Sequence, residues 1–183
     1  EEDKTTLITT ESGLVVGLYA DAFQFSEDAI RKNVQSLRDQ GAEIIVCAFH
    51  WGTEGSYRPT ADQKKFAQAA IDAGADIVYG HHPHVLQKIE EYGDGIIYYS
   101  LGNFCFGGNR NAYQVNSSKK KVAVQDAAPA LLVRAVLTFD DEGNYKGQQM
   151  TLYPVQTTSV DRPVDSTEDQ VNDFQPKFVT GRL

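Results

Sequence analysis

The apolar residues of this chain gather in short runs that are typical of buried strands. Residues 14–19 (LVVGLY) form the first run, residues 43–49 (EIIVCAF) the second and residues 76–80 (DIVYG) the third. Each run is short, contains β-branched residues and is bounded by glycine or polar residues, as expected for strands that are buried on both faces. The pattern therefore predicts three strands in the first half of the chain.

Helical signals fill the two intervals between these strands. Ser26 is a candidate N-cap for the first helix, and Gly41 follows its last apolar residue. Thr60 and Gln63 have the spacing of a capping box, and the alanine-rich segment after them ends at Gly74. The order strand, helix, strand, helix, strand predicts right-handed βαβ units, and therefore an α/β fold around a parallel sheet.

The pattern changes to antiparallel hairpins after this core. Residues 85–92 and 96–100 are predicted strands, and the Gly93-Asp94-Gly95 turn between them is a strong hairpin signal. A second hairpin is predicted from residues 130–139 and 145–155, which flank a polar turn.

The remaining segments are polar and do not divide the chain. Residues 102–129 form a glycine-rich loop, and residues 156–183 form a tail of low periodicity. With no internal repeat and no linker, we predict a single partial domain over residues 1–183. It comprises a βαβ core at 13–92 and antiparallel strands at 93–155.

Charge and composition exclude several classes of protein. The formal net charge of the 183 residues is -8, which argues against nucleic acid as a partner because binding its phosphates requires a basic surface. The basic run Lys119–Lys121 is interpreted as a solvated loop. Cys47 lies inside an apolar run and is interpreted as a core residue, and Cys105 has no partner that the sequence places beside it. No apolar stretch reaches the length of a membrane span, about 18 residues.

All four histidines follow predicted strands. His50 comes directly after the second strand, and His81, His82 and His84 come directly after the third. Ligands of parallel sheets bind beyond the carboxyl ends of the strands, and imidazole is a common ligand of transition metals. We therefore predict a metal site at this edge, with surface or core histidines as the alternative.

Three further residues near this edge have two interpretations each. Glu54 lies four residues after His50. In the first interpretation it acts at the site, by orienting a histidine or contacting a ligand, and in the second it is a solvated loop acid. Asn103, which follows the predicted strand 96–100, either donates a hydrogen bond to substrate or supports a turn. Trp51 either contacts a polymer or packs in the core.

Five short motifs in order give the chain a family resemblance. They are HWG-x-E at 50–54, P-x-x-x-Q at 59–63, DAGAD at 72–76, G-x-HPHV at 80–85 and SLGNF at 100–104. With these motifs the chain resembles the CapA family of bacterial poly-γ-glutamate capsule synthesis proteins, over roughly residues 13 to 155.

The resemblance implies a fold and a metal site. The family belongs to the metallophosphoesterase (calcineurin-like) superfamily, whose domains are four-layer α/β/β/α sandwiches with two divalent metal ions, here manganese, iron or zinc. By position, His50 matches a lone histidine ligand, and His82 with His84 matches a final H-x-H motif. His81 is ambiguous, so it is assigned with Glu54 and Asn103 to a supporting or substrate-contacting position.

The superfamily's earlier ligand blocks, which begin with Asp-x-His, are absent from this sequence. We therefore interpret the chain as the C-terminal half of the domain, and we expect residues 1–183 alone to bind metal weakly or not at all and to be inactive. The resemblance also suggests a position outside the cytoplasm at the cell surface, with a membrane anchor in a segment absent from this chain.

Two functions of different classes follow. In the first, the full-length protein is a metal-dependent, phosphoesterase-like hydrolase that acts on an anionic polymer or a phosphoester-like substrate during capsule synthesis. In the second, it is a non-catalytic accessory module that binds polymer or the membrane proteins of capsule synthesis and export.

Overall fold

Two separate units make up the part of the chain that the computed structural model describes. The units comprise residues 1–101 and 102–183. The described residues are 4–103, 113–115, 121–123, 129–140, 145–157 and 176–178.

A six-stranded sheet with two helices forms the first unit. The strands follow one another across the sheet in the order β1-β2-β3-β4-β6-β5. The central strands β2, β3, β4 and β6 are parallel, and β1 and β5 join the two edges in antiparallel orientation. The elements are β1 (Thr5–Thr9), β2 (Val15–Ala22), α1 (Glu27–Asp39), β3 (Ile44–His50), α2 (Ala61–Asp72), β4 (Ile77–His81), β5 (Ile89–Tyr92) and β6 (Gly95–Tyr98).

Both predicted helices are present, with the predicted ends. The Ser26 side chain accepts a hydrogen bond from the amide of the third residue of α1. Thr60 and Gln63 form both hydrogen bonds of a capping box at the start of α2. Gly41 (φ 94°) and Gly74 (φ 105°) follow the two helices in the left-handed conformation that ends a helix.

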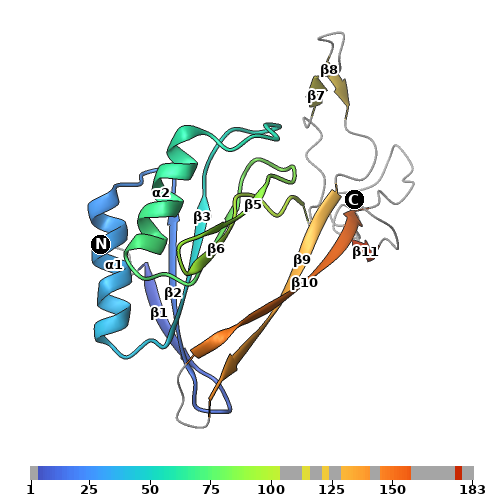
Figure 1. The fold of residues 1–183 in the computed structure, drawn as a ribbon. Coiled ribbons are helices and arrows are strands. Elements are labelled where there is room, and N and C mark those ends of the chain that lie inside the picture. The colour runs from blue at the N-terminus through green and yellow to red at the C-terminus, as the bar shows by residue number, and fades with distance from the viewer. Residues whose placement is uncertain are drawn as a thin grey trace, which may run out of the picture. The chain divides into compact units, whose positions relative to one another are not determined.

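The two helices lie on the same side of the sheet (Figure 1). Side chains of alternate strand residues, including Phe49 and Val78, pack in one apolar core with α1 and α2. The intervening residues point to the opposite side. On β3 and β4 they pair in register, Ala48 with Tyr79 and His50 with His81. We call this side of the sheet the histidine face.

The first unit differs from the sequence prediction in two places. Strand β1 was not predicted, because its sequence TTLIT is largely threonine and has no apolar run. The predicted strand 85–92 is shorter and begins at Ile89.

The predicted hairpin at Gly93-Asp94-Gly95 is confirmed, but it belongs to the main sheet because β6 pairs in parallel with β4. The sheet therefore continues beyond the predicted core boundary at residue 92, and the division between units falls after residue 101.

The second unit contains one long antiparallel hairpin and shorter antiparallel pairings. Its elements are β7 (Tyr113–Val115), β8 (Lys121–Ala123), β9 (Pro129–Phe139), β10 (Tyr145–Thr157) and β11 (Pro176–Phe178). Strands β9 and β10 form the second predicted hairpin, β11 pairs with β10, and β7 pairs with β8. Strand residues thus occur in both the predicted loop 102–129 and the predicted tail 156–183. Most other residues of these two segments, including Cys105, lie outside the described part of the chain.

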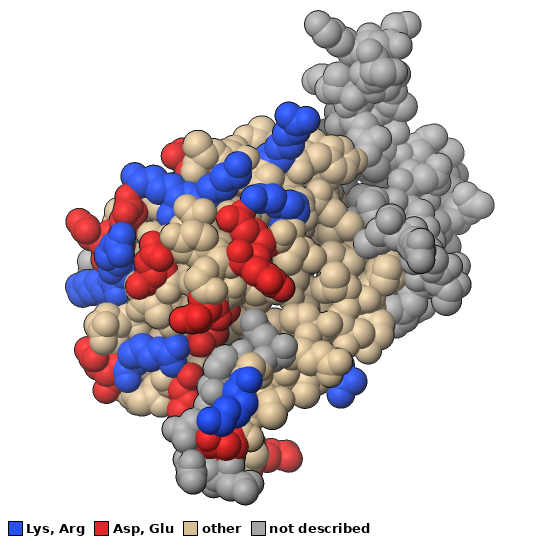
Figure 2. Space-filling view, viewed as in Figure 1, with Lys and Arg blue, Asp and Glu red and all other residues tan. Residues whose placement is uncertain are grey.

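The arrangement of the first unit confirms the α/β class and agrees with a metallophosphoesterase-like fold. On the face that Figure 2 shows, acidic and basic side chains are interspersed over the coloured residues, with no continuous basic stripe among them. None of the helices in the described residues is long and apolar enough to cross a membrane.

Gly80, on β4, gives a direct test of the packing beneath the histidines. A Cβ atom at this position would lie 2.1 Å from Trp51 Nε1 and 2.3 Å from the Tyr99 carbonyl oxygen. We expect Gly80→Ala to lower the free energy of unfolding by about 1–3 kcal/mol, because overpacking a filled core forces neighbours to move. Urea denaturation measures this, with Lys32→Ala on the exposed side of α1 as the control. Equal stability of the two variants would contradict the packing described.

Candidate metal centre

Imidazole rings from the last residues of β3 and β4 and from the turn after β4 meet at the carboxyl ends of these strands. The ring centroid of His50 lies 5.1 Å from that of His81 and 4.8 Å from that of His82. The centroids of His82 and His84 are 6.2 Å apart. The two histidine-bearing segments therefore lie beside each other, which is the arrangement that their positions after neighbouring strands predict.

Backbone hydrogen bonds hold the two segments together. The Trp51 amide donates to the His81 carbonyl oxygen over 3.1 Å, which extends the β3–β4 ladder by one residue. Further along, the Gly55 amide donates to the Pro83 carbonyl oxygen over 2.8 Å. These bonds fix the loop that carries Glu54 against the His82-Pro83-His84 turn.

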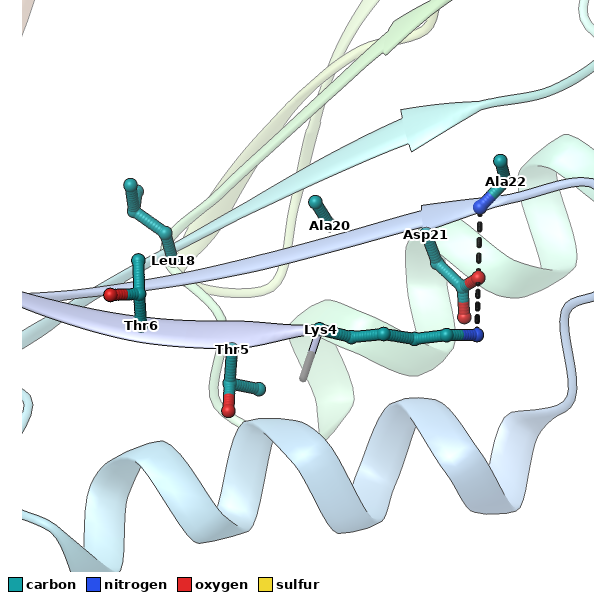
Figure 3. A pocket seen from close by; sticks show the side chains of 7 residues that line it. All are labelled: Lys4, Thr5, Thr6, Leu18, Ala20, Asp21 and Ala22. Atoms are coloured by element: carbon teal, nitrogen blue, oxygen red, sulfur yellow. Dashed lines mark hydrogen bonds and ion pairs between the residues drawn. The ribbon is translucent and has the colours of Figure 1, made fainter. Parts of the chain in front are cut away.

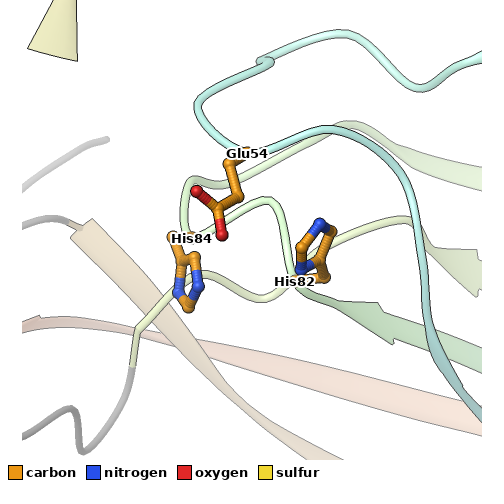
Figure 4. Close-up of side chains that lie close together, drawn as sticks. All are labelled: Glu54, His82 and His84. Atoms are coloured by element: carbon orange, nitrogen blue, oxygen red, sulfur yellow. The ribbon is translucent and has the colours of Figure 1, made fainter. Parts of the chain in front are cut away.

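Glu54, His82 and His84 form the group in the described residues with the spacing of metal ligands. One carboxylate oxygen of Glu54 and one ring nitrogen of each histidine all lie within 4.8 Å of one another. In Figure 4 the Glu54 carboxylate reaches from its own loop toward the two rings. From the sequence, Glu54 was expected either to support the site or to be a solvated loop acid. Its position in the structure also allows it to be a direct metal ligand.

The backbone of the histidine turn is strained. His82 (φ 99°) and His84 (φ 58°) adopt positive φ, and Phe23 (φ 57°) is the other residue besides glycine that does so in the described part of the chain. This region is costly for residues with a Cβ atom, by roughly 1–2 kcal/mol each. Strain of this kind concentrates at functional sites, where the surrounding structure maintains it.

The surroundings favour the neutral form of two of the imidazoles, His50 and His81. Burial lowers the pKa of His50, and the nearby His82 and His84 lower it further. Burial also lowers the pKa of His81, with smaller contributions from the other three histidines. A neutral imidazole keeps a free lone pair, which is the form that binds a metal ion.

Phe23 is part of this site, although no sequence pattern predicted it. Its side chain is 61% exposed, and its ring lies edge-on to His50 and His82, with centroids 4.8 and 5.0 Å away. It is the first residue after β2, and β2 is the neighbour of β3 in the sheet. A recess of about 260 Å³ beside it is lined by Phe23, Phe25, Trp51, Gly52, Thr53, Thr60, Asp62, Gln63 and Phe66.

Two buried amide side chains support the Glu54 loop. The Gln63 amide nitrogen donates to Gln87 Oε1 over 2.9 Å, and Gln87 Nε2 donates to the Ser56 carbonyl oxygen over 2.8 Å. Gln63 also accepts from the Thr60 amide in the capping box. The start of α2, the segment after the histidine turn and the Glu54 loop are therefore joined by one hydrogen-bonded chain.

The alternatives left open for Trp51 and Asn103 have different outcomes. Trp51 is only 3% exposed and donates a hydrogen bond to the Tyr99 carbonyl oxygen over 3.0 Å. It therefore packs in the core, which was one of its two interpretations. Asn103 lies in the second unit, and its contact with substrate stays a prediction.

A second concavity lies along β1 and β2, away from the histidines in sequence (Figure 3). Its buried acid, Asp21, accepts hydrogen bonds from Lys4 Nζ at 2.8 Å, Tyr19 Oη at 2.7 Å and the Ala22 amide at 2.8 Å. These partners compensate the carboxylate, and we interpret it as a structural group rather than as part of the metal centre.

The donor set at the histidine edge fits particular metals. Several imidazoles with one carboxylate suit manganese, iron and zinc, whereas magnesium and calcium prefer oxygen ligands alone. His50, His82, His84 and Glu54 are thus suited to hold the divalent ions that the family resemblance implies. Their assignment as ligands stays a prediction.

Comparison with known proteins places this arrangement in a family. Residues 3–108 match the family described as bacterial capsule synthesis protein PGA_cap, which is more than half of the chain. The chain belongs to this family. The PGA_cap match contains every helix and strand of the first unit and every histidine, whereas the β9–β10 hairpin, which the resemblance also included, lies outside it.

Relatives of the PGA_cap chain carry names that refer to capsule, PGA or polyglutamine synthesis. It is 43% identical over 88 residues to the capsule biosynthesis protein CapA of Bacillus anthracis, covering 46% of this chain and 21% of that protein. It is 54% identical over 65 residues to the PGA biosynthesis protein CapA of Bacillus subtilis, covering 36% and 17%. A probable polyglutamine synthesis accessory protein of Mycobacterium tuberculosis is 36% identical over 61 residues, covering 33% and 16%. The matched part of the chain thus spans about a fifth or less of these relatives.

Gln87→Ala tests whether the amide chain supports the Glu54 loop. The change leaves the Ser56 carbonyl without this donor and leaves the Gln63 amide nitrogen with only its 3.4 Å bond to the Tyr99 carbonyl oxygen, so we expect a loss of about 1–3 kcal/mol in the free energy of unfolding. Gln68→Ala is the matched control, because that amide makes only a long bond of 3.4 Å to Glu90 and its loss is expected to cost under about 0.5 kcal/mol. Urea titrations that rank Gln68→Ala as the more damaging change would contradict the role given to Gln87.

Proposed function

We propose that this PGA_cap chain supplies one half of a divalent-metal, hydrolase-type site in a CapA-like protein of capsule (poly-γ-glutamate) synthesis. The observation that carries the proposal is the convergence of Glu54, His82 and His84, whose ligand atoms lie within 4.8 Å of one another, with His50 beside them. The printed names of the Bacillus relatives support the capsule role.

The histidines and Glu54 would have different roles in such a site. His50, His82 and His84 offer imidazole nitrogen donors, and Glu54 offers a carboxylate that offsets part of the charge of two divalent cations. The strained turn and the Gly55–Pro83 hydrogen bond hold these donors in place before any ligand arrives. When bound, divalent manganese, iron or zinc lowers the pKa of a coordinated water and neutralises charge on the attacked group.

The proposed substrate is an anionic polymer or a phosphoester-like group. Local positive charge would have to come from the metal ions, because the chain carries a net charge of -8 and the side chains around the histidines add Glu54 and Asp62. The proposal places the protein at the cell surface outside the cytoplasm, held there by another part of the molecule and working with the membrane proteins of capsule synthesis.

A non-catalytic accessory function is the second candidate. It is favoured by the printed name of the Mycobacterium tuberculosis relative, which describes an accessory protein. The exposed ring of Phe23 and the aromatic recess beside it give this alternative a surface on which a polymer or partner could bind.

Metal content and turnover of the full-length protein test the first function. We expect about two equivalents of transition metal and hydrolysis of bis-p-nitrophenyl phosphate in the wild type. His82→Ala should lose at least one equivalent together with turnover, and Glu54→Gln should weaken binding by roughly 10- to 100-fold. Glu43→Gln, an exposed acid at the opposite end of β3, is the matched control and should change neither.

Metal-free wild-type protein that still binds poly-γ-glutamate would overturn the hydrolase proposal and favour the accessory function. Metal bound equally by the wild type and by His82→Ala would show that the ions occupy a different site.

A further inference from the structure

His81 is a half-buried residue whose two ring nitrogens lack hydrogen-bond partners among the described residues. Both of its ring nitrogens are buried, and neither finds a donor or acceptor among the residues that the structure describes. A buried polar group without a partner costs about 1–3 kcal/mol, so such groups are rare and require an explanation.

The same side of the sheet holds the other group of this kind in the described residues. The Tyr98 hydroxyl is buried and unpartnered, and Tyr98 pairs in register with Tyr79, two residues before His81 on β4. The unsatisfied side-chain atoms found in the described part of the chain are therefore confined to the histidine face. The apolar core beneath the helices has none among these residues.

The spacing of the His50 and His81 rings fits a shared metal ion. Two imidazoles that bind one tetrahedral ion, with metal–nitrogen bonds of about 2.0–2.1 Å, have ring centroids about 5 Å apart. The His50 centroid lies 5.1 Å from that of His81 and 4.8 Å from that of His82. Both separations agree with this value, whereas the 6.2 Å between His82 and His84 is longer.

We propose that His81 is a direct metal ligand, which shares one divalent transition-metal position with His50. Glu54, His82 and His84, whose ligand atoms lie within 4.8 Å of one another, are then left for the second position. This inference rests on the proposed metal-dependent function and adds to it a ligand that the family motif does not assign. It also explains the burial of His81, because metal binding satisfies one nitrogen that the protein leaves unpaired.

The alternative is that His81 is a packing residue of the sheet. For such a residue, an apolar side chain of similar size would be equal or better, since it removes two unpaired nitrogens. The two possibilities thus predict the same stability for His81→Phe in metal-free protein but different metal binding.

Cobalt binding by the full-length protein separates them. We expect His81→Phe to lose one of two cobalt equivalents, or to bind it at least roughly tenfold more weakly, with a changed visible absorption spectrum. Its melting temperature without metal should match or exceed that of the wild type. Tyr79→Phe is the matched control, because its ring lies 6.0 Å from His81 on the same face but offers no metal-binding nitrogen. It should leave both cobalt sites unchanged.

A second measurement counts the imidazole ligands directly. X-ray absorption of the zinc-loaded full-length protein should show more imidazole ligands per ion in the wild type than in His81→Phe. Unchanged cobalt stoichiometry and spectrum in His81→Phe, or equal numbers of imidazoles per ion in the two proteins, would overturn the role of His81 while the proposed function stands. Wild-type protein that binds neither cobalt nor zinc would overturn both.

Discussion

Parallel pairing of β3 with β4 is the interaction on which the site depends. The ladder places His50 directly beside His81, and one further hydrogen bond, from Trp51 to the His81 carbonyl, carries the register past the ends of the strands. Because side chains alternate along a strand, a shift of one residue in this register would turn His50 away from the histidine face. The imidazole cluster is therefore a consequence of strand register and of the short turn that follows β4.

Packing beneath the strands maintains that register. Gly80 admits the Trp51 ring and the Tyr99 carbonyl at distances that no side chain would permit, so the histidine turn starts from a tightly filled layer. The Gln63–Gln87 amide pair then joins α2, the turn and the Glu54 loop by buried hydrogen bonds. Rigid support of this kind allows a strained turn to persist and holds donor atoms close together without a ligand.

Periodicity and capping signals predicted most of the first unit, because its elements are local. Ser26, Thr60 and Gln63 each act in the helix that they begin, and the three apolar runs are strands. The position of the histidines after adjacent strands also predicted where they meet. Membership of the PGA_cap family, inferred from five motifs, is confirmed. Strand β1 and the place of the β5–β6 hairpin in the main sheet depend on pairing with distant residues, which local patterns do not reveal.

The same reason explains what the sequence missed at the site. Phe23 lies far from the histidines along the chain and reaches them only because β2 pairs with β3. Glu54 is one of several acidic residues near the histidines in sequence, and only the Gly55–Pro83 hydrogen bond shows that its loop lies opposite His82 and His84.

The most direct test of the account is anomalous scattering from crystals of the full-length protein grown with manganese or zinc. The account predicts metal density within about 2.0–2.2 Å of donor atoms of these histidines and Glu54. Well-ordered rings with no metal density between them, at saturating metal, would contradict it.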